Sequence, residues 1–331
     1  MITQAQRSLW SVAVVCLTLA GCAGESNNLT ATQDDDTDNP VTNTAVTNTM
    51  VPVSSAISTD NVECMYSYSE FNNSPSVNMT SSADWFCDAT SRWLAANGIP
   101  DHDVGTFPNA ANPNTITTQA VSASFTLTPV ATSTATTLGG PQGAVGYVLN
   151  GVKIDPGTGG TCNDAGNNCS LGGAATGSWR IEALGQNSFD FGEDANNAHV
   201  QPTGSYHYHG MPEGFIAKLN KGTAMTLIGW AADGFPIYAR YGYSDPLDAS
   251  SPIREIQSSY ALKTQADANR PDESIYAMGT FSQDYEYVAG LGDLDECNGR
   301  TGVTPEFPDG IYHYFATDSY PFLQRCIKGA Q

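Results

Sequence analysis

The sequence predicts a mainly β fold, a β-rich α+β single globular domain that is braced by disulfides and carries one or two short helices. Three observations support this prediction. Short apolar runs alternate with turn signals, the 331-residue chain holds 32 glycines and 18 prolines, and six cysteines lie beyond residue 60. Glycine and proline supply the backbone angles of tight turns, so their abundance suits many short strands.

Three segments carry the strand signal. Residues 121–128 alternate apolar and polar side chains with period two and stop before Pro129. Residues 145–154 contain two apolar runs around Asn150-Gly151, and residues 225–241 repeat this arrangement around Asp233-Gly234. Asn-Gly and Asp-Gly between apolar runs favour two-residue hairpin turns. The sequence therefore predicts one strand and two hairpins.

One helix is predicted over residues 82–97, and a weaker one near residues 263–269. Ser82 or Asp84 would cap the start of the first helix, and Gly98 would end it. Its shared apolar face would comprise Trp85, Phe86, Trp93 and Leu94.

The first 21 residues are predicted to be a lipoprotein signal peptide. Arg7 precedes an apolar stretch, residues 9–19, that is too short to span a membrane. Small residues then precede Cys22, as in a bacterial lipobox, so Cys22 would be acylated; the alternative is ordinary secretion with an incidental cysteine. Ala23 favours the outer membrane of a Gram-negative cell. We therefore expect a cell-envelope lipoprotein that faces the periplasm or the surface.

Residues 22–60 are predicted to be a disordered linker, and residues 61–331 the folded domain. The linker is rich in Thr, Asn and Asp and has no aromatic residue, so it buries too little apolar surface to offset ordering entropy. It would tether the domain to the membrane.

The chain is strongly acidic. Its 13 Lys+Arg and 34 Asp+Glu give a net charge of −21, and removal of Arg7 with the signal leaves 12 − 34 = −22. This charge excludes nucleic acid and anionic lipid headgroups as partners, so the lipid anchor would be the only membrane contact. It permits divalent cations, although a solvated acidic surface is the plainer interpretation. A protein or glycan partner is not specified.

Six cysteines remain once Cys16 and Cys22 are set aside. In an oxidising compartment an even count indicates disulfides, here three out of fifteen possible pairings. Nearest-neighbour pairing predicts Cys64–Cys87, Cys162–Cys169 and Cys297–Cys326. Oxidised thiols cannot ligate a metal, so any metal site should use nitrogen and oxygen.

The histidines carry the main functional signal. Residues 206–209 read Tyr-His-Tyr-His, and residues 310–315 echo them with one histidine, His313. On a strand, His207 and His209 would face the same way about 7 Å apart, with the tyrosines packed on the other face. His313 would add a third nitrogen if the two strands lie near each other. His199, beyond a bend at residues 202–204, or His102 would complete the set.

Such a set would bind copper or zinc. Three imidazoles with an open position suit either metal, and the Irving–Williams order favours copper. Met211 could add a soft thioether, although packing is its plainer role. Nearby carboxylates could fix the imidazole tautomers; these are Asp101, Asp103, Glu193 and Asp194.

Calcium is a weaker possibility. The acidic segment 293–300 matches no EF-hand spacing and is better interpreted as a disulfide-held loop in which Arg300 pairs with an acid. Residues 155–169 have no phosphate-loop lysine and favour a surface Ω-type loop.

Several separate segments resemble the bacterial YHYH-domain family. They are the YHYH motif at 206–209, the His199–Gly204 stretch, the hairpin 233–238, the segment 295–300 and the C-terminal residues 312–329. The similarity runs from about residue 97 to the end of the chain. It implies an exported bacterial protein, often a lipoprotein, and no particular activity. Phe315 departs from the motif, so the echo offers one imidazole instead of two.

We therefore expect the histidine cluster to bind a transition metal. One alternative is a metal-dependent hydrolase of an ester, phosphoester or glycan, and another is a non-catalytic structural or adhesive module. No nucleophile elbow, dinucleotide fingerprint or His-Glu-x-x-His pair is present. Catalytic residues, and whether the domain is an enzyme at all, are left open at this level.

Overall fold

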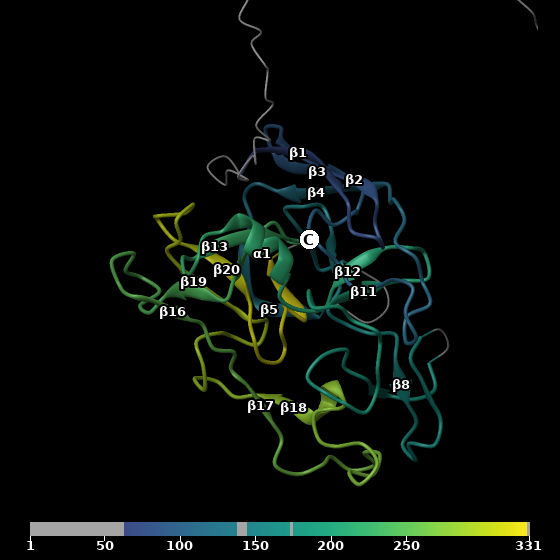
Figure 1. The fold of residues 1–331 in the computed structure, drawn as a ribbon. Helices are drawn as coiled ribbons and strands as arrows, with labels where there is room; N and C mark the ends of the chain where they lie inside the picture. Colours follow the sequence, from purple (N-terminus) through teal and green to yellow (C-terminus); the bar gives the residue numbers. More distant parts are fainter. Residues whose placement is uncertain (1–62, 138–143, 173–174, 330–331) are drawn as a thin grey trace, which may run out of the picture. The chain divides into compact units, whose positions relative to one another are not determined.

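The computed structural model of the chain describes residues 63–137, 144–172 and 175–329 (Figure 1). The described part is a β-rich single domain, as predicted, with one α-helix, α1 (Glu213–Leu219), and one short 3-10 helix, η1 (Ser282–Asp284). No helix in these ranges has the length and apolar character needed to cross a membrane. The predicted signal peptide, Cys22 and the linker lie outside the described residues.

The largest sheet has eight strands in the order β11-β12-β7-β6-β13-β14-β20-β19. Its strands are β6 (Gly146–Val148), β7 (Lys153–Ile154), β11 (Ala198–Val200), β12 (Tyr206–Tyr208), β13 (Thr226–Ala231), β14 (Pro236–Ala239), β19 (Gly299–Gly302) and β20 (Ile311–Ala316). Both predicted hairpins are confirmed, β6–β7 and β13–β14. Gly151 and Gly234 turn them with φ of 78° and 88°, a region that favours glycine.

This sheet is built from two halves with the same strand plan. Each half has a hairpin, β6–β7 or β13–β14, followed by an antiparallel pair, β11–β12 or β19–β20. The last strand of each half runs parallel to the second hairpin strand. The halves meet where β6 and β13 pair antiparallel, with Tyr147 opposite Trp230. Residues 145–155, 194–199 and 204–209 therefore correspond to 228–238, 295–300 and 310–315.

Hydrogen bonds repeat across the two halves. Leu149 N donates to Ile228 O over 2.8 Å, and the equivalent Ala232 N donates to Val145 O over 2.9 Å. The turns that precede β11 and β19 also match, with an Asp194 N to Ala198 O bond of 2.9 Å and an Asp295 N to Gly299 O bond of 2.8 Å. The echoed Tyr-His-Tyr motif thus occupies equivalent strands of a structural repeat.

The helix predicted at residues 82–97 is wrong. A second, four-stranded sheet includes most of these residues. Its strands are β1 (Met65–Asn72), β2 (Met79–Cys87), β3 (Ser91–Ala96) and β4 (Val121–Thr126). Asp88 Oδ1 accepts bonds from the N–H groups of Thr90 and Ser91, both 2.8 Å, which closes a β2–β3 turn. Trp85 is buried while Phe86 is exposed, so burial alternates with the period of a strand. The predicted strand at 121–128 is confirmed as β4.

The helix predicted near residues 263–269 is also wrong. These residues follow β17 (Tyr260–Leu262) and are irregular. The i,i+4 ion pair between Lys263 and Asp267, 2.6 Å, forms although no helix surrounds it. A charge pair of this spacing contributes only a few tenths of a kcal/mol and cannot nucleate a helix alone. The single α-helix instead follows the YHYH motif.

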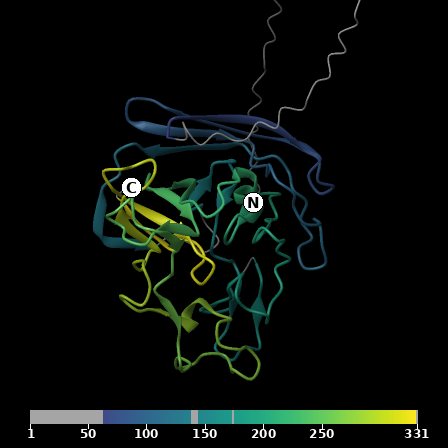
Figure 2. The same ribbon diagram turned by 60° about the vertical axis from the view of Figure 1, so that its left-hand side comes forward.

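The two larger sheets share one core. Trp85 Nε1 donates to Leu149 O over 2.9 Å, which ties β2 to the β6–β7 turn. Gly151 in that turn packs so closely on Ala96 that a side chain there would clash. Figure 2 shows the four-stranded sheet lying across the eight-stranded one. The core therefore encloses the YHYH strand β12, whose Tyr206 and Tyr208 are fully buried.

Smaller sheets and three disulfides complete the domain. The remaining strands are β5 (Ala131–Thr137) with β21 (Cys326–Gly329), β8 (Thr161–Cys162) with β9 (Cys169–Ser170) and β10 (Trp179–Arg180), β15 (Tyr241–Tyr243) with β16 (Ile253–Glu255), and β17 with β18 (Tyr285–Tyr287). The predicted disulfide pairing is confirmed as Cys64–Cys87, Cys162–Cys169 and Cys297–Cys326.

Candidate metal centre

The β11–β12 hairpin brings His199 directly opposite His207. Between them the chain turns at residues 201–204, where Gly204 N donates to Gln201 O over 2.8 Å. Gly204 has a φ of 83°, and a side chain there would clash with Thr117, so only glycine fits this turn. The bend at residues 202–204 therefore returns the chain so that a histidine eight residues upstream lies beside the motif.

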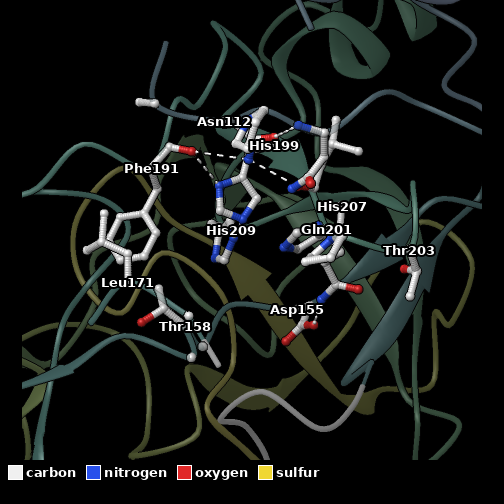
Figure 3. A pocket seen from close by; sticks show the side chains of 18 residues that line it. Asn112, Asp155, Thr158, Leu171, Phe191, His199, Gln201, Thr203, His207 and His209 are labelled. Carbon is white, nitrogen blue, oxygen red and sulfur yellow. Dashed lines mark hydrogen bonds between the residues drawn. The ribbon is translucent and has the colours of Figure 1, made fainter. Parts of the chain in front are cut away.

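Three imidazoles converge as a result (Figure 3). The ring centroids of His199 lie 4.7 Å from His207 and 4.6 Å from His209, and His207 and His209 are 4.7 Å apart. One nitrogen from each ring lies within 4.8 Å of the other two, a spacing that could hold a metal ion. The shared strand face expected for His207 and His209 is thus what the structure shows.

Backbone carbonyls orient all three rings. His199 Nδ1 contacts Phe191 O at 2.9 Å. His207 Nδ1 contacts Ser205 O, and His209 Nδ1 contacts Pro156 O, both at 3.3 Å. A carbonyl only accepts, so each Nδ1 carries the proton and each Nε2 keeps its lone pair. Two of these lone-pair atoms, on His199 and His209, face each other at 3.1 Å.

Burial keeps the triad neutral. The pKa values of His207 and His209 lie well below the usual range, mainly through desolvation and secondly through the neighbouring imidazoles. Desolvation also lowers the pKa of His199. Neutral imidazole is the form that ligates metals, so the protonation state of the three rings at neutral pH is compatible with a metal site.

His102 is not brought to the triad. It lies on the opposite side of β12, where its Nδ1–H donates to Asp103 O over 2.9 Å. Its Nε2 therefore accepts, and receives the Tyr208 hydroxyl at 2.6 Å. Both nitrogens are occupied, which leaves no lone pair for a metal.

His313 is not brought to the triad either. It lies on β20, separated from β12 by β7, β6, β13 and β14. Arg300 stands opposite His313 in the β19–β20 ladder, and its guanidinium bonds Tyr243 O at 2.8 Å. The ion pair predicted for Arg300 is absent from the described residues, because Asp293 pairs with Arg254 at 2.5 Å instead.

The other predicted neighbours are structural. Tyr206 and Tyr208 face away from the triad, as expected, and Tyr206 donates to Asp194 over 2.8 Å. Met211 is 2% exposed within the hydrophobic core. In the described part of the chain, backbone carbonyls orient the imidazoles, and the carboxylates that the sequence suggested do not. Asp101, Asp103 and Asp194 bond to other groups, and Glu193 Oε1 has no hydrogen-bond partner among the described residues.

The triad opens into a pocket of about 590 Å³. Asp155, Gln201 and Thr203 line the polar side, and Phe191 and Leu171 the apolar side (Figure 3). Sequence reasoning placed Asp155 in a surface loop and missed it. The missing signal was the parallel pairing of β7 with β12, which sets Asp155 beside the YHYH strand.

Comparison with known proteins agrees with these features. The model of the YHYH protein family matches residues 122–329, which include the whole eight-stranded sheet and the triad. The chain belongs to the YHYH protein family. No curated protein and no solved structure matches it. Function must therefore be argued for this YHYH domain from its own geometry.

Proposed function

We propose that this YHYH domain binds one transition metal ion, copper or zinc, through the Nε2 atoms of His199, His207 and His209. The observation that carries the proposal is the 3.1 Å contact between the Nε2 atoms of His199 and His209. Metal–nitrogen bonds of 2.0–2.1 Å in tetrahedral geometry place two ligand nitrogens about 3.3 Å apart. The His199–His209 pair is therefore already close to ligand spacing, and His207 offers a nitrogen within 4.8 Å of both.

A cation between these nitrogens explains the contact better than a proton does. Two lone pairs at this distance repel, and a shared proton would require a charged imidazolium. Desolvation disfavours that form, since it lowers the pKa of both His199 and His209. A metal ion removes the repulsion while both rings stay neutral.

The three imidazole nitrogens favour two metals, zinc and copper. Three imidazoles suit zinc and copper, whereas calcium prefers oxygen ligands. Three protein ligands with a pocket on the open side are typical of catalytic sites. The convergence of the rings also argues against the purely structural or adhesive alternative, which leaves the imidazoles apart.

Export as a lipoprotein belongs to the same proposal. The support is sequence alone: the lipobox-like residues before Cys22 and the Thr/Asn/Asp-rich linker. An acylated Cys22 would anchor the domain in the outer membrane and leave nucleic acid out of reach. Replacing Cys22 with alanine is expected to move the protein from the membrane fraction to the soluble fraction on immunoblots. Equal membrane association of both proteins would refute the anchor.

Metal content by elemental mass spectrometry tests the central proposal. The full-length chain, purified without a histidine tag, is expected to hold about one equivalent of copper or zinc. The double variant His207→Ala/His209→Ala is expected to hold none. His313→Ala is the matched control, because it removes an imidazole outside the triad, and it should keep the metal. Circular dichroism would confirm that each variant folds.

Two results would contradict the proposal. One is a wild-type chain that contains no metal and takes none up when copper or zinc is added. The other is a folded double variant with the same metal content as the wild type.

A metal-dependent hydrolase is the second candidate, and one observation favours it. The open side of the triad faces a pocket large enough for a small substrate, and a carboxylate, Asp155, lines that pocket. A site with three protein ligands and an open position can activate water.

A further inference from the structure

We propose that Asp155 is a catalytic residue, and that the centre hydrolyses a neutral carboxylic ester with Asp155 holding the attacking water. This inference rests on metal binding by the triad and deepens it. It assigns a reaction type, a substrate class and a residue that the YHYH motif does not contain.

The carboxylate of Asp155 is fixed on one side and free on the other. Its side chain is 2% exposed, and its Oδ2 accepts bonds from Lys153 Nζ and from Gln201 Nε2, both 3.0 Å. The other oxygen, Oδ1, is buried and has no hydrogen-bond partner among the described residues. An unpaired buried carboxylate oxygen is costly, so a missing partner such as water is expected there.

Asp155 is tied to the triad through the backbone. Its N–H donates over 3.0 Å to the carbonyl of Tyr208, the residue between His207 and His209. The next carbonyl, Pro156 O, accepts the Nδ1–H of His209. Asp155 lines the same pocket as the three rings but is not among the groups within 4.8 Å of one another. Asp155 thus borders the pocket into which the triad opens and is not one of the three clustered ligands.

The other half of the sheet offers an internal comparison. The positions equivalent to His199, His209 and Asp155 are Arg300, Phe315 and Tyr238. Where the imidazole cluster is missing, the carboxylate is missing too. By contrast, the tyrosines at 206 and 208 are kept as tyrosines at 312 and 314. Between the two halves, the carboxylate of Asp155 is therefore present only beside the imidazole cluster, whereas the tyrosines of the shared scaffold are present in both.

The proposed reaction is balanced without any further reagent. Asp155 Oδ1 accepts a hydrogen bond from the water, whose oxygen then bonds to the ester carbonyl carbon. The water's proton passes to Asp155, and Asp155 transfers it to the alcohol oxygen as the carbon–oxygen bond breaks. Ester and water give acid and alcohol. A positioned acid–base group of this kind accelerates reactions by about 10²–10⁴-fold.

Pocket composition selects the substrate class. Asp155 is the only acidic residue, and no lysine or arginine is present, among the described residues that line it. A phosphoester would bring negative charge beside Asp155, and the nearest cation, Lys153, already bonds the Asp155 carboxylate, so no cationic side chain among the described lining residues is left to pair with the phosphate. A neutral ester avoids this repulsion, and Leu171, Phe191 and Pro113 offer apolar surface to an acyl group.

The test compares three full-length proteins: wild type, Asp155→Asn and Asp309→Asn. Asp309 is exposed and outside the pocket, so its variant controls for the change in net charge. Each is loaded with zinc, assayed for bound metal and tested on 4-nitrophenyl acetate, bis(4-nitrophenyl) phosphate and a 4-nitrophenyl glucoside. Wild type and Asp309→Asn are expected to hydrolyse the acetate, and Asp155→Asn to lose about 100-fold in kcat/KM with full metal content.

A second readout does not depend on turnover. Azide binding to the cobalt-loaded proteins is followed by visible absorption. Asp155 repels an anion at the open position, so Asp155→Asn is expected to bind azide about 10-fold more tightly, and Asp309→Asn to match wild type.

Each contrary result has a distinct meaning. A wild type that binds no metal overturns the proposed function itself. Loss of metal in Asp155→Asn makes Asp155 a ligand, and preferred hydrolysis of the phosphodiester or glucoside overturns the substrate class. Unchanged azide affinity in metal-loaded Asp155→Asn overturns the role of Asp155.

Discussion

The two halves of the eight-stranded sheet share a scaffold but differ in chemistry. In both, the second tyrosine of the motif bonds to the hairpin turn: Tyr208 accepts from Asn150 Nδ2 at 3.0 Å, and Tyr314 donates to Asp233 at 2.6 Å. The tyrosine faces therefore keep the same architecture. The histidine faces differ, because only the first half gathers three imidazoles around a pocket.

The residue across the strand decides what each histidine can do. His207 faces His199, a second metal ligand, whereas His313 faces Arg300, a fixed cation. The pKa of His313 is lowered to about 4, mainly because the imidazole is buried and to a smaller extent because Arg300 is positively charged. A cation at that position also repels a metal ion. The same Tyr-His-Tyr strand thus serves as a candidate site in one half and as core packing in the other.

The largest effect is expected from exchanging the residues at the second histidine position of the motif, which is His209 in the first half and Phe315 in the second half. His209→Phe copies the second half into the first and removes one of three ligands. We expect metal affinity to fall by more than the 10–100-fold that loss of an outer-shell partner costs. Phe315→His makes the reverse change, but Arg300 remains opposite His313, so no second metal equivalent is expected. Calorimetric titration with zinc would measure both.

Phe315→His also tests whether the second half is core. Phe315 is fully buried, and an imidazole there should lower the free energy of unfolding by about 1–3 kcal/mol. A stable Phe315→His variant that binds two metal ions would show that the motif alone makes the site and would refute the role of the opposite strand.

Acid unfolding should sharpen the comparison at His313. Its pKa of about 4 when folded and 6.5 when unfolded means that the unfolded state binds the proton first. Stability is therefore full above pH 6.5, falls between pH 6.5 and 4, and loses roughly 2–3 kcal/mol by pH 4.5 from this residue. His313→Gln cannot titrate, so the metal-free variant should lose less on acidification. Urea unfolding at pH 7.5 and 4.5 measures the difference; equal losses would contradict the buried, neutral His313.

Local patterns predicted much of this fold. The two hairpins follow from Asn150-Gly151 and Asp233-Gly234, where the turn residues determine the pairing within a few positions. The strand at 121–128 follows from an equally local alternation, and the three disulfides follow from pairing each cysteine with its nearest neighbour in the sequence. The predicted helix at 82–97 failed because its aromatic residues suit two alternating strands as well as a helical face, and the Asp88 turn decided between them.

Long-range pairing accounts for what the sequence could not reveal about the site. His207 and His209 share a face by strand periodicity, so their proximity was predictable. His199 reaches the motif through the short bend at residues 202–204, whereas the distance of His313 depends on the strands between β12 and β20, whose pairings join residues far apart in the chain. Asp155 reaches the pocket through the parallel β7–β12 pair, which no local pattern indicates.

The tyrosines provide the smallest and most selective test, because they should behave alike in the two halves. Tyr314→Phe leaves the buried Asp233 carboxylate without one of its donors, and Tyr208→Phe leaves His102 Nε2 without its donor. We expect a loss of about 2 kcal/mol for the first, whose partner is charged, and about 1 kcal/mol for the second. Urea unfolding measures these losses, and metal content should stay at the wild-type value in both. Loss of metal in Tyr208→Phe alone would mean that the tyrosine face also positions the triad, and that the two halves differ in scaffold as well as in site.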